Sequence, residues 1–139
     1  MIRLTDEMRT LVDGALANGT PCLLATVSPS GAPNLGFKGS VMVFDDKRLA
    51  YWERTRGGHL ANLEQNPQVV VLYADLGKGV VWTFRGVAAL HRDGPLRDQV
   101  MARVVQPELD RDPGRKGVAV LIQVDRVLNI ARQVVQQRD

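Results

Sequence analysis

The chain has 139 residues, of which 45% are hydrophobic and 24% charged, as expected for one globular domain with a substantial core. Lys and Arg outnumber Asp and Glu by 18 to 15, so the formal net charge is +3. This mild excess permits an anionic ligand. An aromatic content of 5% provides too few rings for a base-stacking surface, which argues against a nucleic-acid partner.

Cysteine usage and the amino-terminal segment limit the class of protein further. Cys22 is the only cysteine in the sequence, so the chain can form neither an internal disulfide nor a zinc cluster. It lies in the apolar run 21–27, where a small buried side chain is expected. The first ten residues lack the apolar core of a signal peptide, and no run is long enough to span a membrane. We therefore expect a cytoplasmic protein with no membrane partner.

The first part of the chain is predicted to contain one helix and four strands. Thr5 is a candidate N-cap, and apolar residues at helical spacing predict a helix over residues 5–18. Residues 21–28 are typical of a buried strand, and a turn at 29–31 predicts that residues 32–37 pair with it antiparallel. Two short strands are expected at residues 40–44 and 48–53, joined by a turn.

The second part alternates strands with short helices. A helix is predicted over residues 59–66 and another from Pro95 to about residue 105. Strands are expected at residues 69–74, 80–91 and 118–124, with Gly86 marking a bulge or barrel corner, and a loop at residues 107–116. About seven strands joined mostly by turns predict one mainly β domain over residues 1–139, a closed or nearly closed antiparallel barrel.

A basic loop containing glycine leads into the helix predicted over residues 59–66. It carries Arg54, Arg56, Gly57 and Gly58. The first N–H groups of a helix lack partners and lie at the positive end of its dipole, so they attract phosphate or carboxylate, and Lys38 could add a charge-assisted hydrogen bond. A Gly-Gly pair before a helix is also an ordinary turn, and loop arginines are usually solvated. The residues alone support both interpretations about equally.

Four blocks of the sequence resemble the FMN-binding split-barrel family, the pyridoxamine 5'-phosphate oxidase-like proteins, and among these the small bacterial FMN-binding proteins. They are LATVSPSGAPNL at 24–35, KGSVMVFDDKRLAYW at 38–52, GGHLANLEQNPQVVVLY at 57–73 and FRGVAALHRDGP at 84–95. The order and spacing of these blocks carry the resemblance over nearly the whole chain. It implies an antiparallel split β-barrel with a few short helices, forming a homodimer with FMN in a groove between the subunits.

The resemblance also implies a set of cofactor-binding residues. Phe37, Lys38, Gly39 and Ser40 are expected along the flavin, Glu53, Arg54 and Thr55 along the ribityl chain, and Gly58, His59 and Asn62 at the phosphate. The expected phosphate position coincides with the anion site argued from the residues alone. The flavin would carry the chemistry of an oxidoreductase or electron-transfer protein, and the sequence identifies no catalytic side chain.

Two departures from the family pattern leave alternatives open. Many members have Lys or Arg where this chain has His59, so either nearby groups supply the contact, or FMN binds weakly, or the ligand is a deazaflavin cofactor or haem. The chain ends in NIARQVVQQRD, unlike the arginine- and histidine-rich segment of true pyridoxamine phosphate oxidases, so that activity is not expected. The alternative function is a non-enzymatic dimeric barrel that binds a cofactor for sensing or storage, or has none.

Other chemistry finds little support in the sequence. The chain has no GxSxG motif, and its two histidines and one cysteine are too scattered to predict a metal site. His91 is expected to be a solvated surface residue. Changing Lys38 or Arg54 to Ala is expected to weaken FMN binding while leaving the dimer folded.

Overall fold

The computed structural model describes residues 1–55 and 57–139, so Arg56, one of the candidate cations, lies outside the described residues. Within the described chain, eight strands form one sheet: β1 (Cys22–Val27), β2 (Pro33–Lys38), β3 (Met42–Val43), β4 (Arg48–Glu53), β5 (Gln68–Asp75), β6 (Val80–His91), β7 (Val118–Leu128) and β8 (Val134–Gln137). The helices are α1 (Asp6–Asp13), α2 (Gly58–Gln65), α3 (Gly94–Arg103) and α4 (Gln106–Asp110).

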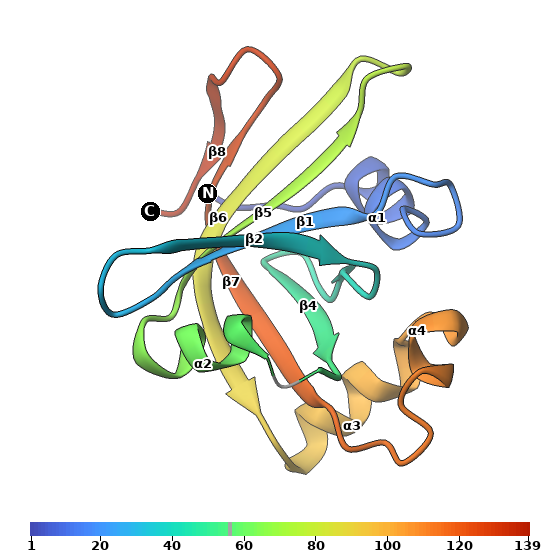
Figure 1. Ribbon diagram of the computed structural model, residues 1–139. Helices are drawn as coiled ribbons and strands as arrows, with labels where there is room; N and C mark the ends of the chain where they lie inside the picture. The colour runs from blue at the N-terminus through green and yellow to red at the C-terminus, as the bar shows by residue number, and fades with distance from the viewer. Residues whose placement is uncertain (56) are drawn as a thin grey trace.

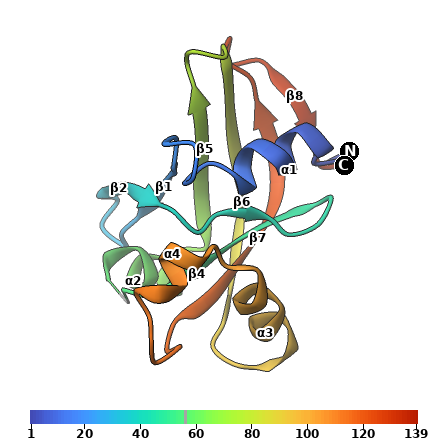
Figure 2. The ribbon, with the colours of Figure 1, turned by 90° about the vertical axis from the view of Figure 1, so that its right-hand side faces the viewer.

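The sheet is antiparallel throughout and strongly curled. Its strand order is β2-β1-β5-β6-β7-β4-β3, and β8 pairs with β7. Figure 1 shows β1 and β2 crossing the long strands β5 and β6 at a steep angle. Helix α1 lies across the sheet in the second view (Figure 2), and its Met8 and Val12 join the barrel core. This is the antiparallel split β-barrel that the sequence predicted.

Strands β4 and β7 are apolar on both faces because each face meets a different core. Tyr51 and Ile122 point into the barrel core, where both are fully buried. Trp52 and Leu121 point to the opposite side and pack with Val100 of α3 in a second, smaller cluster. The helix α3 thus covers the outer face of β4 and β7, which explains the near-continuous apolar run of β7.

The long β6 pairs with both β5 and β7, and its register with β7 shifts between Arg85 and Gly86. A Cβ atom at Gly86 would run into the backbone carbonyl of Gln123. Glycine is therefore required at this crossing, and the bulge predicted at Gly86 is confirmed.

Two predicted elements are shorter than expected. Thr5 is the N-cap of α1, accepting a hydrogen bond from Met8 N at 3.2 Å, but the helix stops at Asp13 instead of continuing to residue 18. Gly14 is its C-cap, and turns follow up to Gly19. The strand predicted over residues 40–44 is reduced to the two residues of β3, and Ser40 bonds to Trp52 of β4 through its side chain.

Three features near the carboxyl terminus were not predicted. Helix α4 lies within the segment expected to be a loop, β7 continues four residues beyond the predicted end to Leu128, and the short β8 returns along it. The two chain ends lie side by side in both views, where the amino group of Met1 donates to the carbonyl of Gln137 (Figures 1 and 2).

Candidate functional site

Strand β2 carries polar residues on the face toward α2 and β4 and apolar residues on the opposite face. Asn34, Gly36 and Lys38 occupy the polar face. The opposite face carries Leu35 and Phe37, which are 68% and 69% exposed. Their partners on β1 extend the apolar character of this outer face, which comprises Leu23, Ala25, Val27, Pro33, Leu35 and Phe37. The pattern is the reverse of an ordinary edge strand, which turns its apolar side to the core.

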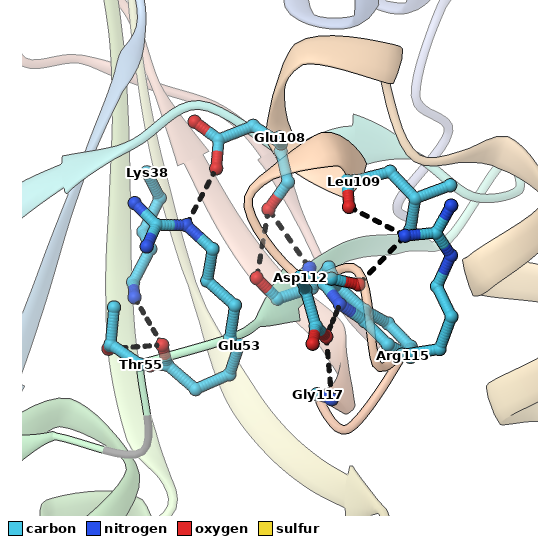
Figure 3. A network of polar contacts seen from close by, with 11 residues as sticks. Lys38, Glu53, Thr55, Glu108, Leu109, Asp112, Arg115 and Gly117 are labelled. Carbon is cyan, nitrogen blue, oxygen red and sulfur yellow. Dashed lines mark hydrogen bonds and ion pairs between the residues drawn. The ribbon is translucent and has the colours of Figure 1, made fainter.

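An ion pair joins β2 to β4 at the polar end of the site (Figure 3). Lys38 Nζ lies 2.6 Å from Oε2 of Glu53, and Thr55 Oγ1 donates to the same oxygen at 3.0 Å. Glu53 is fully buried, and its Oε1 has no hydrogen-bond partner among the described residues. The ammonium of Lys38 also lies 5.6 Å from the centre of the Tyr51 ring. Lys38 is therefore bound by the protein and does not extend freely into solvent.

A second ion pair connects β4 to helix α4. Arg54 Nε lies 3.3 Å from Oε2 of Glu108, and both side chains are partly buried. The carboxylate of Glu108 also lies over Gly39, where a Cβ atom would collide with it. Gly39 thus lies against the Glu108 carboxylate, and a larger residue there would displace that flexible side chain.

Ser40 forms hydrogen bonds with the backbone of β4. Its hydroxyl accepts from Trp52 N at 3.0 Å and donates to Trp52 O at 3.1 Å, and the residue is 3% exposed. The side chain therefore takes the place of a backbone ladder pair at this position. The role that the structure gives Ser40 is to hold the β2–β3 segment against β4.

The amino end of α2 approaches β2 and β1 closely. Gly57 is the N-cap and has no side chain with which to satisfy the first amides of the helix. A Cβ atom at Gly58 would lie 3.2 Å from Nδ2 of Asn34, and one at Gly36 would lie 3.4 Å from Nε2 of His59. At these glycines the amino terminus of α2, His59 and the polar face of β2 lie close together.

His59 is linked to β1 through Thr26. Nδ1 of His59 and Oγ1 of Thr26 are 2.8 Å apart, and Nδ2 of Asn62 donates to the same oxygen at 3.0 Å. Burial lowers the pKa of His59 below its usual value of 6.5, Lys38 lowers it further, and Glu53 opposes both. His59 is therefore neutral at pH 7.

The structure groups most of the predicted site residues around two neighbouring points. Lys38, Gly39, Ser40, Glu53, Arg54 and Thr55 gather where β2, β4 and α4 meet, and Gly58, His59 and Asn62 gather where α2 meets β1 and β2. Phe37 lies apart from both groups, on the exposed outer face of β2. The predicted roles of these ten residues toward a cofactor stay predictions.

The electrostatics differ from the expectation of free cations around an anion site. Each of the two described candidate cations, Lys38 and Arg54, already has a carboxylate partner. Among residues 1–55 and 57–139, His59 and the first amides of α2 are donors without a carboxylate partner, and they are neutral groups at the positive end of a helix dipole. This set fits the phosphate of a cofactor that approaches α2, because backbone amides and a histidine N–H bind phosphate oxygens without a buried cation.

Sequence reasoning missed Thr26, Asn34 and Glu108. Asn34 and Thr26 sit in strands that were predicted, yet nothing in a strand pattern indicates which helix they face. Glu108 lay in a predicted loop. The signal for α4 in the sequence was Pro107, because proline is common in the first turn of a helix.

A polar anchor beyond the site fixes the end of β4. Asp112 accepts hydrogen bonds from Trp52 Nε1 at 2.9 Å and from the backbone of Lys116 and Gly117. Arg97 lies 4.8 Å from the Trp52 ring. Burial raises the pKa of Asp112, but these hydrogen bonds and Arg115 outweigh burial, and the pKa lies below its usual value. Asp112 is therefore ionised and holds Trp52 next to Glu53.

Other functional classes can be compared with the described residues. Cys22 is buried as predicted, and burial raises the pKa of its thiol to about 12. In residues 1–55 and 57–139, no three His, Cys, Asp or Glu side chains are grouped as a metal ion would require. No helix in the same residues is long and apolar enough to cross a bilayer.

The fold and the site define the class of protein as a split β-barrel with a polar site between β2, β4 and α2. The profile of the pyridoxamine 5'-phosphate oxidase family matches residues 4–129, and the chain belongs to this family. A comparison with curated protein sequences gave no match.

Solved structures share the fold over nearly the whole chain. HupZ of Group A Streptococcus is 26% identical, with a TM-score of 0.73, covering 97% of this chain and 98% of HupZ. A candidate pyridoxamine 5'-phosphate oxidase of Lactobacillus delbrueckii is 26% identical, with a TM-score of 0.70 and coverage of 91% and 93%. An FMN-binding protein of Syntrophomonas wolfei is 17% identical, with a TM-score of 0.70 and coverage of 89% and 86%, and this likeness concerns the fold alone.

Proposed function

We propose that this protein binds FMN and acts as an oxidoreductase or electron-transfer protein. The observation that carries the proposal is the glycine-lined amino end of α2, which meets His59 and the polar face of β2. Membership of the pyridoxamine 5'-phosphate oxidase family and the shared fold of an FMN-binding protein support the choice of FMN. A bound flavin supplies the redox chemistry, and the protein supplies position and electrostatics.

Each group of site residues has a separate part in this proposal. Gly58, His59 and Asn62 form the phosphate end, where the helix amides and the histidine donate hydrogen bonds. Glu53, Arg54 and Thr55 follow the ribityl chain. Phe37, Lys38, Gly39 and Ser40 shape the flavin side, with Ser40 acting through its bonds to the Trp52 backbone.

The proposal includes a homodimer that forms through the outer face of β1 and β2. Leu35 and Phe37 are the most exposed residues of this face, and a groove of about 260 Å³ continues it across Leu23, Val70 and Leu72. Exposed apolar patches of this kind mark interaction surfaces. A second copy would cover this apolar face, Phe37 included.

The dimer is tested by sedimentation of a Phe37→Glu variant. We expect the wild type to be dimeric and the variant to be monomeric, because a carboxylate would be buried in the interface. Leu76→Glu is the matched control, since Leu76 is 78% exposed in the turn between β5 and β6. A dimeric Phe37→Glu protein would place the interface elsewhere.

A second candidate function is a dimeric barrel that binds its cofactor for sensing or storage, or has lost it. The pairing of Lys38 with Glu53 and of Arg54 with Glu108 favours this candidate, because compensated cations attract an anionic cofactor less strongly. A deazaflavin cofactor or haem would be the ligand of such a barrel if FMN does not bind.

The deciding experiment is a binding titration with FMN and with riboflavin, followed by removal of unbound ligand and an absorption spectrum. We expect retained flavin and tighter binding of FMN than of riboflavin, because only FMN carries the phosphate. Equal affinities for FMN and riboflavin would show that the phosphate does not contact α2. Bleaching of the bound flavin by NADH or NADPH without oxygen would support redox activity, and a protein that retains no flavin would favour the second candidate.

A further inference from the structure

Among the described residues, Thr26 of β1 bonds to both His59 and Asn62, the polar side chains of α2 at the proposed phosphate site. Its hydroxyl is 2.8 Å from Nδ1 of His59 and 3.0 Å from Nδ2 of Asn62. The residue is 4% exposed, so its hydroxyl depends on these two partners. The contact spans 33 residues of sequence and ties α2 to the strand beneath it.

The chemistry of the three groups favours one direction for each hydrogen bond. The amide nitrogen of Asn62 can only donate, so it occupies a lone pair of the Thr26 oxygen. The hydroxyl proton of Thr26 is buried, and among the described residues Nδ1 of His59 is the acceptor within reach, so we assign Nδ1 as the acceptor of this bond. A neutral imidazole that accepts at Nδ1 carries its own proton on Nε2.

The free N–H of His59 faces the proposed site. Nε2 lies beside Gly36, 3.4 Å from the position that a Cβ atom would take there. Gly36 shares the polar face of β2 with Asn34 and Lys38, and Asn34 in turn lies next to Gly58 at the amino end of α2. The donor hydrogen of His59 and the first amides of α2 therefore belong to the same surface.

We propose that Thr26 is a positioning residue of the phosphate site, whose hydroxyl holds the His59 ring so that Nε2–H donates to an anionic oxygen of the ligand. This inference rests on the proposed function. It explains how a neutral histidine can serve at the amino end of α2. Lys38 already stands nearby, so a neutral donor adds a hydrogen bond without adding a second positive charge.

The test uses protein labelled with ¹⁵N-histidine at pH 8, above the lowered pKa of His59. The sequence has only two histidines, so a His91→Gln variant assigns the signals of His59. We expect the wild type to show Nε2 protonated and Nδ1 unprotonated, with the Nδ1 resonance shifted by an accepted hydrogen bond. Thr26→Val should remove that shift, and Thr26→Ser should restore it. Urea midpoints check that all variants are folded.

FMN titrations of the same proteins supply the functional readout. We expect Thr26→Val to bind FMN about tenfold more weakly and Thr26→Ser to bind like the wild type, while riboflavin affinity stays equal in all three. A wild-type His59 protonated at Nδ1, or a Thr26→Val protein with unchanged Nδ1 resonance, would overturn the proposal. So would Thr26→Val binding FMN as tightly as the wild type.

The two proposals fail in different ways. If the wild type does not retain FMN, the proposed function fails, and the spectrum of His59 then decides the inference alone. If FMN binds and Thr26→Val changes neither the spectrum nor the affinity, the inference fails while the proposed function stands.

Discussion

Lys38 Nζ lies 2.6 Å from Oε2 of Glu53, which makes the lysine expected to contact a ligand the counterion of a fully buried carboxylate. Lys38 itself is only 12% exposed. Removing one partner of such a pair leaves an uncompensated buried charge, which costs far more than the pair contributes. Contrary to the expectation from the sequence, we therefore expect Lys38→Ala to destabilise the fold.

We predict that Lys38→Met lowers the free energy of unfolding by about 3 kcal/mol, because Glu53 loses its partner in a buried position. Urea unfolding followed by tryptophan fluorescence measures the change. The double variant Lys38→Met, Glu53→Gln should recover part of the loss, since no unpaired charge is left.

Lys78→Met is the control for the loss of a positive charge, because Lys78 is exposed in the turn between β5 and β6. It should leave the urea midpoint within experimental error of the wild type. An equally small effect of Lys38→Met would show that Glu53 does not depend on the ion pair.

Glu108 is paired with Arg54 and would compete with an anionic ligand for this arginine. We predict that Glu108→Gln increases the affinity for FMN about threefold, since a partly exposed ion pair of this kind contributes below about 1 kcal/mol. The gain should disappear in the Arg54→Gln background. Isothermal titration of the four proteins gives the coupling between the two residues.

Glu7→Gln controls for the added net charge, because Glu7 is exposed on α1. It should leave FMN affinity unchanged. If Glu7→Gln raises the affinity as much as Glu108→Gln, the effect is one of overall charge and not of Arg54.

The lowered pKa of His59 predicts a pH dependence of stability. The ordinary value of 6.5 applies to the unfolded chain, and the pKa in the folded protein is lower. As the pH falls below about 6.5, the unfolded chain takes up a proton that the folded protein resists, so stability decreases until the folded pKa is passed. Wild type should therefore lose more stability between pH 8 and pH 5 than His59→Gln.

Thermal unfolding of both proteins across this pH range checks the sign. The two proteins differ only at residue 59, so the difference between their curves reports on His59. If the stability of wild type and that of His59→Gln depend on pH in the same way, burial does not disfavour the charged form of His59.

Ile122 tests the assignment of the barrel core. It is fully buried, with 0% exposure, in the middle of β7. We predict that Ile122→Asp destabilises the protein by about 4 kcal/mol or more, because an unpaired carboxylate would be buried. The neighbouring Gln123 is exposed, so Gln123→Asp should be nearly neutral in urea unfolding. A stable Ile122→Asp protein would remove this position from the core.

The local patterns of the sequence determined most of the elements. Alternation and turn residues placed β1, β2 and the β5–β6 hairpin, and Thr5 marked the start of α1. Gly86 marked the bulge in β6. These features depend on residues close together in the chain, so hydrophobic period, capping chemistry and glycine conformations are enough to predict them.

Tertiary contacts decided the composition of the site. Thr26 meets His59 across 33 residues, and Arg54 meets Glu108 across 54. Neither contact can be predicted from the local hydrophobic periodicity of the sequence, because the curl of the sheet and the packing of α4 bring these residues together. The sequence thus determined that arginines, a lysine and a glycine-lined helix start occur near one another, and only the folded chain decided which of the charges are already paired.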